Sequence, residues 1–445
     1  MTVHQPISTA EGLGAETGTV GRPDQASTQI EQGWGQGPSA RYEALAAPFR
    51  PVFRRIRADA VVRDAERRLP YEELEWLKAA RFTTLRVPVE RGGQGATLPE
   101  LVNLLIELSE ADPNITNILR PHIGVTEDLL NARNEAYRTR WLERIVAGET
   151  FGNGFSETGG NVGAMTTSFV AEGEDWRLNG RKFYTTGSLF ADWINMGGLD
   201  EDGNATGAIV PRHADGVEVI DDWNGFGQML TGSGTTVFND VHVPGDLVNP
   251  EKGRARYVGG FFQLVHLATL AGIGRAAAND VARLVAERSR AYGHGNADQA
   301  RHDPQILAVV GRVRGAAYAA GAIVLKTAEA LQRVYERNQA GDPLGEEREG
   351  ALADVEVNEA VTVVSDLVLN ATTQLFDALG SSGAGRDHGL DRHWRNARTI
   401  TSHNPRVYRD RIAGAFAVNG TLPAQIRRNV KDGAPRDNSA LPPAV

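Results

Sequence analysis

The stretch GQMLTGSGTTVFNDVHVP, residues 227–244, decides the fold, because it closes a series of short strand-like runs that lie between two long helical regions. The runs at 167–188, 191–212 and 217–227 are likewise rich in β-branched and aromatic residues, and turn pairs such as Asn-Gly and Asp-Gly separate them. This pattern predicts a small antiparallel sheet, sandwich or barrel that forms a middle β domain at residues 151–257.

Both flanks of this β region show helical periodicity. Residues 41–150 place apolar side chains three and four positions apart, which predicts an N-terminal helical domain. Residues 258–430 predict an antiparallel helical bundle, because they contain three long Ala-rich amphipathic runs, at 261–292, 304–338 and 350–379. The predicted class is therefore α+β, mainly α.

The ends of the chain and its composition narrow the function. Residues 1–40 and 431–445 hold few large apolar side chains, so we expect a flexible extension and a flexible tail. A net charge of −9 over 445 residues does not favour the binding of nucleic acid. The absence of cysteine excludes disulfides and thiolate chemistry. No metal site, membrane span or secretory signal is predicted, which makes a cytoplasmic location the default expectation.

Four loop motifs carry the functional prediction. VPVERGGQG (87–95), FSETGGNVGA (155–164), LNGRKFYTTGS (178–188) and residues 227–244 all lie between predicted elements. With RNAR at 395–398, they resemble the acyl-CoA dehydrogenase superfamily over roughly residues 45 to 425. The resemblance implies a helical domain, a β domain and a C-terminal four-helix bundle, with a flavin held between them.

The segment RNARTITSHNPRVYRDR, residues 395–411, departs from the dehydrogenase pattern. His403 occupies the position at which the dehydrogenases carry a catalytic Glu, so the expected carboxylate base is missing. The remaining pattern resembles the two-component flavin-dependent monooxygenases of this fold, such as dibenzothiophene and dimethylsulfone monooxygenases. That resemblance implies FMN, possibly FAD, reduced by a separate flavin reductase. It also implies O2 as co-substrate, a flavin hydroperoxide, a homotetramer and a small organosulfur, amine or aromatic substrate.

Matching motif positions imply the site residues. An imidazole whose pKa lies near neutrality can accept or donate a proton. An aromatic side chain that excludes water, with hydrogen-bond donors nearby, suits oxygen activation. The catalytic candidates are His403, His122, Asn153 and Thr185. The cofactor-binding candidates from this resemblance are Ser156, Thr158, Thr185 and Trp223. Arg290, Ser381 and Ser382 are added because a guanidinium and a Gly- and Ser-rich loop suit phosphate.

Alternatives remain open from sequence. The enzyme could be an acyl-CoA dehydrogenase or oxidase with FAD and a relocated base, for which the glutamates of ADVEVNEAV (353–361) are candidates, or a non-catalytic flavin-binding scaffold. His122 could be a core histidine, Trp223 a packing residue and Asn153 a turn residue. GSSGAG (380–385) could be a phosphate cradle or a plain loop. Each of four arginines could bind phosphate through bidentate hydrogen bonds or could be an ordinary solvated residue: Arg288, Arg290, Arg386 and Arg398.

Overall fold

The N-terminal region is helical, as predicted. The structure is a computed structural model that describes residues 33–158, 165–251, 253–290 and 292–426, and every element below belongs to one unit that begins at Gly35. Most of residues 1–40 and all of 431–445 lie outside the described residues, so the flexible extension and tail stay predictions. The helices of this region are α1 (Tyr42–Ala46), α2 (Arg50–Ala58), α3 (Ala60–Ala65), α4 (Tyr71–Ala79), α5 (Leu98–Ala111), α6 (Pro113–Leu130) and α7 (Glu135–Val146), with short 3-10 turns η2 (Phe82–Thr84) and η3 (Val89–Arg91).

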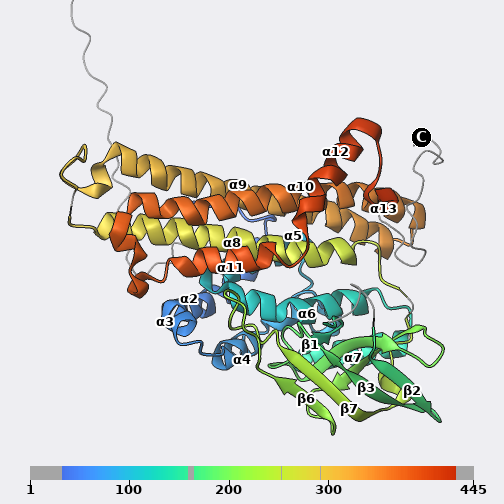
Figure 1. Ribbon diagram of the computed structural model, residues 1–445. Helices are drawn as coiled ribbons and strands as arrows, with labels where there is room; N and C mark the ends of the chain where they lie inside the picture. The colour runs from blue at the N-terminus through green and yellow to red at the C-terminus, as the bar shows by residue number, and fades with distance from the viewer. Residues whose placement is uncertain (1–32, 159–164, 252, 291, 427–445) are drawn as a thin grey trace, which may run out of the picture. The chain divides into compact units, whose positions relative to one another are not determined.

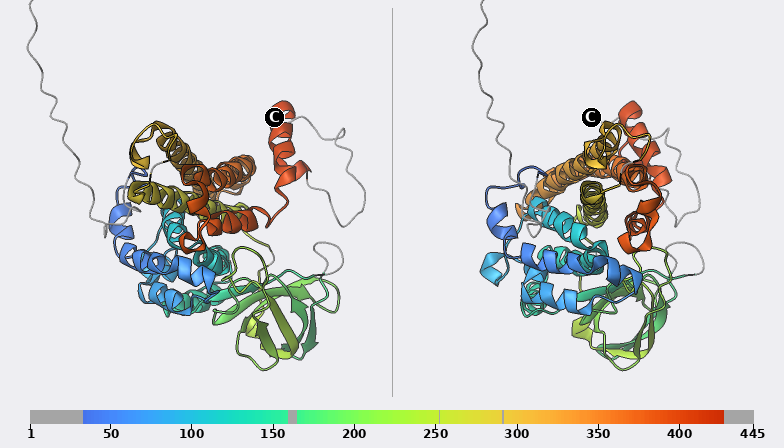
Figure 2. Two further views of the ribbon diagram at one scale, coloured as in Figure 1. Left: turned by 60° about the vertical axis from the view of Figure 1, so that its left-hand side comes forward. Right: turned by 90° about the vertical axis from the view of Figure 1, so that its left-hand side faces the viewer.

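Helices α5 and α6 begin at strong capping signals. Thr97 and Glu100 form a capping box at the start of α5, and the Asp112 carboxylate accepts from the Asn114 backbone N–H at the start of α6. Both helices are buried on nearly all sides, because α5 packs against α8 and α9 of the C-terminal bundle and α6 lies between α8 and strand β1 (Figures 1 and 2). This position makes α6 the element through which the helical and β parts of any central site meet.

The middle region is a single curled sheet. Its strands are β1 (Phe151–Gly154), β2 (Ser168–Glu172), β3 (Asp175–Lys182), β4 (Trp193–Leu199), β5 (Ala205–Pro211), β6 (Val217–Ile220) and β7 (Thr235–Val243). The order is β1-β4-β2-β3-β7-β6, with β5 paired to β4. Its inner face buries a cluster that includes Phe169, Leu178 and Phe238. Most pairs are antiparallel as predicted, but β1 and β4 pair in parallel, as do β2 and β4 at one position. The expectation of a purely antiparallel sheet was therefore wrong at this edge.

The C-terminal region is the predicted bundle. It contains α8 (Val258–Glu287), α9 (Pro304–Gln339), α10 (Pro343–Gln374), α11 (Asp391–Thr401), α12 (Arg409–Asn419) and α13 (Pro423–Ile426). Short 3-10 turns occur at η4 (Gly245–Leu247), η5 (Ala300–His302), η6 (Leu375–Ala378), η7 (Gly380–Ala384), η8 (Arg386–His388) and η9 (Arg406–Tyr408). Helices α8, α9 and α10 run side by side, with α11 along α8 (Figures 1 and 2). The predicted architecture, a curled sheet between helical N- and C-terminal regions, is confirmed.

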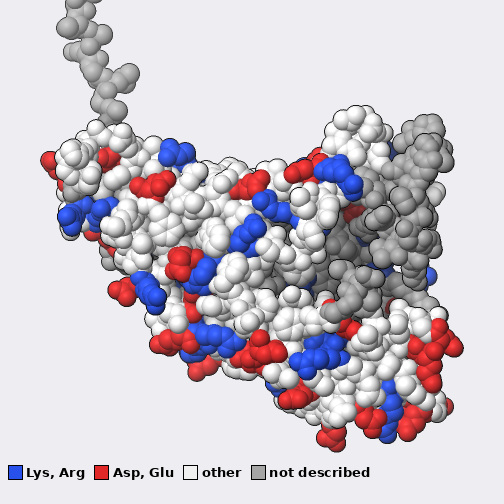
Figure 3. All heavy atoms as spheres, viewed as in Figure 1, with Lys and Arg blue, Asp and Glu red and all other residues white. Residues whose placement is uncertain are grey.

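Two bundle helices are long and apolar enough to cross a membrane by length and composition alone. The most apolar window of α8 is 89% buried inside the protein, so its hydrophobicity builds the core, whereas that of α9 is 28% buried. On the face shown in Figure 3, basic and acidic side chains alternate over the helices and no broad basic patch is visible.

Candidate active site

The segment that carries His403 is fixed at both ends. Helix α11 ends at Thr401, and the backbone N–H of His403 donates to the Ile400 carbonyl. Beyond the turn, Arg406 pairs with Asp366 of α10 at 2.5 Å, and Arg409 donates to Asn358 of α10 at 2.7 Å. His403 therefore lies at the edge of a small recess between α8, α10 and α11, lined by Gln263, His266, Leu267, Leu270, Val361, Ser365, Ile400, Thr401, His403 and Asn404.

The His403 ring contacts a cation and a second imidazole. The Arg120 guanidinium lies 3.2 Å from Nε2 of His403, and the His266 ring packs edge-on against it with centroids 4.4 Å apart. Arginine can only donate, so Nε2 must accept and His403 must be the neutral tautomer that carries its proton on Nδ1. The residue is exposed, yet desolvation of its ring and then the Arg120 cation lower the pKa of His403 to about 3, while a hydrogen bond with the Asn404 side chain acts in the opposite direction.

This environment corrects the reason given for choosing His403. Sequence reasoning relied on an imidazole whose pKa lies near neutrality, but the structure holds His403 neutral across the physiological range. The ring is suited to donating a hydrogen bond through Nδ1–H rather than to supplying a whole proton. His266 is buried and is also held neutral, because burial and the Arg120 cation lower its pKa well below 6.5.

A wall of cations and aromatic rings joins this group to the sheet. Arg120 lies over the Phe262 ring, 5.5 Å from its centroid. Arg254 lies over the same ring at 5.2 Å and over the Phe155 ring at 5.6 Å, and pairs with Asp128 at 3.1 Å. Phe155 directly follows β1, so the wall connects the His403 end of the bundle with the loop expected to meet a flavin.

The loop after β1 presents hydroxyls around a buried anchor. Ser156 and Thr158 are exposed, which leaves both side chains accessible to a cofactor. Between them, Glu157 accepts from Lys182 Nζ at 2.6 Å and from Thr166 and Thr167, and these bonds lower the pKa of Glu157 to about 2 despite its burial. The rest of this motif, residues 159–164, lies outside the described residues.

Asn153 and Thr185 differ in availability. The Asn153 side-chain oxygen Oδ1 is buried and has no hydrogen-bond partner among the described residues. This acceptor is therefore available to a bound ligand. Thr185 is fully buried; its hydroxyl donates to the Gly234 carbonyl at 3.0 Å and accepts from Thr236 at 2.9 Å. The hydroxyl therefore bonds within the sheet and keeps one lone pair, and its predicted contact with a flavin stays a prediction.

Trp223 belongs to a loop that reaches the His403 helix. Its ring is half-buried beside Tyr184, with centroids 6.0 Å apart, and its Nε1–H donates to the Gln228 carbonyl at 2.9 Å. The backbone N–H of Gln228 donates in turn to Asn396 of α11 at 2.6 Å. The loop thus couples the sheet to α11 and leaves the ring of Trp223 partly exposed.

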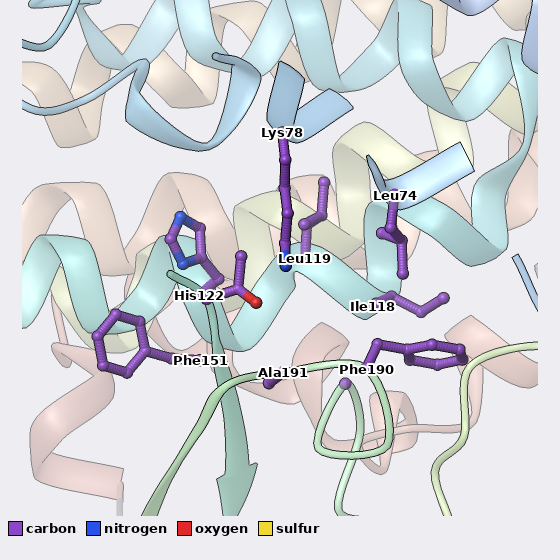
Figure 4. Close-up of a pocket in the computed structure, with 10 residues that line it drawn as sticks. Leu74, Lys78, Ile118, Leu119, His122, Phe151, Phe190 and Ala191 are labelled. Carbon is purple, nitrogen blue, oxygen red and sulfur yellow. The ribbon is translucent and has the colours of Figure 1, made fainter. Parts of the chain in front are cut away.

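His122 is separated from His403. The two residues Arg120 and His122 are about 200° apart around α6, so the imidazole points towards α4 and β1 (Figure 4). It is buried, donates through Nε2 to the Thr83 carbonyl at 2.9 Å and stacks on Phe151. Burial lowers the pKa of His122 to about 4, while its Nδ1 has no partner in the described chain. The small pocket it lines also contains Lys78 and Leu74 of α4. The structure does not bring the two predicted acid–base histidines together.

The predicted phosphate groups lie at the opposite end of α8. Arg288 donates to the carbonyls of Ala378 and Leu379, whereas Arg290, Ser381 and Ser382 are exposed. Arg288 follows His266 by 22 residues, so the two are about 33 Å apart along α8. Within one chain these groups do not reach His403. Arg386 is also exposed and Arg398 is half-buried, and nothing in their surroundings assigns them to phosphate.

Two residues of this site were missed from the sequence, Arg120 and His266. Each lies in a helical run whose other residues are mostly apolar, ITNILRPHIG and FFQLVHLATL, where they were treated as part of the core pattern. The available signal was the charge itself, because a lone Arg on a helix that is apolar all round must be buried with or without a partner.

The fold and this site define a flavoprotein class, and comparison with known proteins identifies the family. The acyl-CoA dehydrogenase N-terminal domain model matches residues 43–149, and the acyl-CoA dehydrogenase C-terminal domain model matches residues 264–406. Together these matches cover more than half of the chain. The protein belongs to the acyl-CoA dehydrogenase superfamily, and the resemblance drawn from its loop motifs is confirmed.

Within the superfamily, the relatives that align over nearly their whole length include several monooxygenases. Dibenzothiophene monooxygenase of Mycolicibacterium goodii is 26% identical over 84% of this chain and 93% of the relative. A probable FMNH2-dependent monooxygenase of Pseudomonas putida, SfnC, is 25% identical over 82% of this chain and 92% of the relative. The solved complex of TdsC from Paenibacillus sp. A11-2 with FMN and indole is 25% identical and matches with a TM-score of 0.80 over 86% of this chain and 98% of that one.

Proposed function

We propose that the protein is a reduced-flavin-dependent monooxygenase that transfers one oxygen atom of O2 to a small organic substrate. Named relatives that align over more than nine-tenths of their own length are monooxygenases, one of them FMNH2-dependent, and the TdsC structure contains FMN. Reduced FMN, supplied by a separate flavin reductase, is therefore the proposed cofactor, with FAD as the alternative. An organosulfur or aromatic substrate follows from the dibenzothiophene and indole of those relatives, and an amine remains an alternative from sequence.

One observation carries this proposal over a dehydrogenase. None of the described residues that line the recess at His403 is a carboxylate. The glutamates considered as relocated bases lie elsewhere on α10: Glu356 pairs with Arg333 of α9 at 3.3 Å, and Glu359 is exposed. A neutral imidazole whose Nε2 is occupied by Arg120 is a poor base for carbon acids, but its Nδ1–H can donate to a developing negative charge.

The residues present fit a flavin near the loop after β1. Ser156 and Thr158 would hold it by their exposed hydroxyls, the unpartnered Oδ1 of Asn153 would accept from a ring N–H, and Trp223 would cover the ring from water. When bound, reduced flavin supplies the two electrons with which O2 is activated. His403 would donate its Nδ1–H towards the reacting oxygen, while Arg120 keeps the ring in that tautomer.

Assembly and location complete the proposal. A homotetramer would place the exposed Arg290, Ser381 and Ser382 of one subunit at another subunit's flavin, which they cannot reach within their own chain. The sparsely buried α9 offers apolar surface for such contacts. The expected cytoplasmic location belongs to the same proposal, because a soluble reductase has to deliver the flavin.

The test compares His403→Ala with His213→Ala, a control at an exposed histidine of the β domain. Reduced FMN and O2 would be mixed with each protein, with indole or dibenzothiophene as probe substrate, while flavin reoxidation, product and hydrogen peroxide are measured. We expect His403→Ala to lose product by on the order of 10²–10⁴-fold and to release peroxide instead.

Two outcomes contradict the proposal. Wild-type protein that leaves the reoxidation rate of free reduced FMN unchanged would be a scaffold or a dehydrogenase. A His403→Ala variant with undiminished product would remove His403 from the mechanism.

A further inference from the structure

Arg120 is a buried cation without a carboxylate. The residue is 8% exposed, and burial alone lowers the pKa of its guanidinium to about 10. Two other buried arginines of this chain are paired with carboxylates: Arg63 with Glu73 and Asp112, and Arg86 with Glu127. Their anionic partners raise the pKa values of Arg63 and Arg86, which is the opposite of what happens to Arg120. The contrast shows that Arg120 lacks the carboxylate partners that Arg63 and Arg86 have.

The groups that do contact Arg120 leave its charge uncompensated. One N–H meets the neutral His403 ring at 3.2 Å, and the guanidinium lies over the Phe262 ring at 5.5 Å. The buried Nε has no hydrogen-bond partner in the described ranges. A buried unpaired charge is costly to folding, so its presence beside a reactive histidine calls for a ligand that carries the opposite charge.

We propose that Arg120 binds an anionic group on the substrate, either a carboxylate or an oxyanion of sulfur or phosphorus. This inference rests on the proposed function, because it takes the bound anion to be the molecule that is oxygenated. The planar fork of arginine matches two oxygens of such groups, and the free Nε and remaining N–H donors can supply both bonds.

The surroundings also set the orientation of the substrate. Asp128 lies eight residues further along α6, about 12 Å away by the helical rise. It is held by Arg254 at 3.1 Å, and burial raises the pKa of Asp128 to about 6. The charges of Asp128 and Arg254 compensate each other, whereas Arg120 has no carboxylate partner, so an anionic group is favoured at the Arg120 end. The part of the substrate bound by Arg120 therefore lies beside His403, with its apolar part along Phe262.

The test measures binding to flavin-free protein, so it needs neither oxygen nor turnover. Calorimetry would compare two pairs of probes of similar shape, benzoate with benzamide and benzenesulfinate with methyl phenyl sulfone. The proteins are wild type, Arg120→Gln, Arg120→Lys and the control Arg312→Gln, which removes an exposed arginine of α9. We expect wild type and Arg312→Gln to prefer the anion of each pair by about 10- to 100-fold. Arg120→Gln should lose this preference and Arg120→Lys should keep part of it.

Several results would overturn the inference. One is the absence of an anion preference in wild type, including a failure of all four probes to bind; this result remains informative even if Arg120→Gln does not fold. Another is an undiminished preference in Arg120→Gln. A third is a loss of affinity for reduced FMN in Arg120→Gln with anion binding intact, which would assign the charge to the flavin. Failure of the proposed function appears instead in flavin reoxidation by wild type, which requires no anion.

Discussion

The guanidinium of Arg120 lies 3.2 Å from Nε2 of His403 and so fixes the histidine as its Nδ1–H tautomer. Two segments that are 283 residues apart in sequence meet in this one contact. Because a cation next to an imidazole disfavours a second positive charge, the same contact sets both the tautomer and the charge of the ring. His403 is thereby a fixed hydrogen-bond donor over the pH range in which such an enzyme works.

Removing Arg120 should return His403 towards ordinary titration. In Arg120→Met the cation is removed while the desolvation of the ring remains, so the pKa of His403 should rise from about 3 by at least about one unit. Nitrogen-15 NMR of the histidine side chains would follow this, with His403→Asn identifying the signal and exposed His213 serving as a reference. A wild-type His403 signal that titrates near pH 6.5 would contradict the structure.

Gly124 should be intolerant of a methyl group. A Cβ at this position of α6 would lie 2.3 Å from the Phe262 ring, over which both Arg120 and Arg254 are placed. We expect Gly124→Ala to cost about 1–3 kcal/mol of unfolding free energy and to weaken binding of the benzoate probe. Gly259→Ala in α8 is the control, because a Cβ there meets nothing within 4 Å, and it should leave stability unchanged or raise it by up to about 1 kcal/mol. If Gly124→Ala and Gly259→Ala change the free energy of unfolding in urea equally, the Phe262 ring moves aside at no cost and the prediction is wrong.

Glu157 should hold the loop after β1 in place. Its carboxylate is the anionic partner of Lys182, whose side chain is fully buried, so Glu157→Gln leaves a buried ammonium unpaired. We expect a loss of about 3–5 kcal/mol, partly restored in Glu157→Gln/Lys182→Met. The exposed pair Glu172–Arg177 is the comparison, where Glu172→Gln should leave the free energy of unfolding nearly unchanged.

The same Glu157 variants address the cofactor. If the loop positions Ser156 and Thr158 for flavin, the folded fraction of Glu157→Gln should bind FMN more weakly than wild type in a fluorescence titration, and Glu172→Gln should not. Unchanged FMN affinity would show that the loop does not hold the cofactor.

The fold was predictable because each region has its own hydrophobic period, whereas pairing direction was not. Alternation along β1 and β4 reports which residues face the core, but it is the same for parallel and antiparallel neighbours. His403 was found because its motif fixes a register in the chain.

Contacts between residues far apart in the chain could not be predicted from the sequence. The Thr185 hydroxyl matched its motif, yet it bonds to Gly234 and Thr236. Arg120 and His266 were missed for a different reason. A single polar residue in a mostly apolar helix is read as part of the core pattern, and its role becomes visible only when the residues packed against it from other segments are known. Arg290 and the serines of GSSGAG were grouped with the site because their chemistry suits phosphate, and the length of α8 separates them from His403 within one chain.

His122 should make the stability of the protein depend on pH. Its pKa is about 4 in the folded chain, lowered by burial, against an ordinary value of 6.5. Below pH 6.5 the unfolded chain therefore takes up a proton that the folded chain refuses, so stability falls as the pH drops from about 7 towards 4 and is constant above 7. The contribution of His122 to this loss is about 2 kcal/mol at pH 5.

The variant His122→Gln isolates this contribution, because its amide N–H can still donate to the Thr83 carbonyl but does not titrate. Urea denaturation of both proteins at pH 7 and pH 5 gives two differences, from which any fixed cost of glutamine cancels. Wild type should lose about 2 kcal/mol more than the variant between the two pH values. If both lose the same amount, His122 is already protonated in the folded chain or reaches solvent. Its unpartnered Nδ1 would then be an accessible base at the α4–α6 pocket rather than a neutral part of the core.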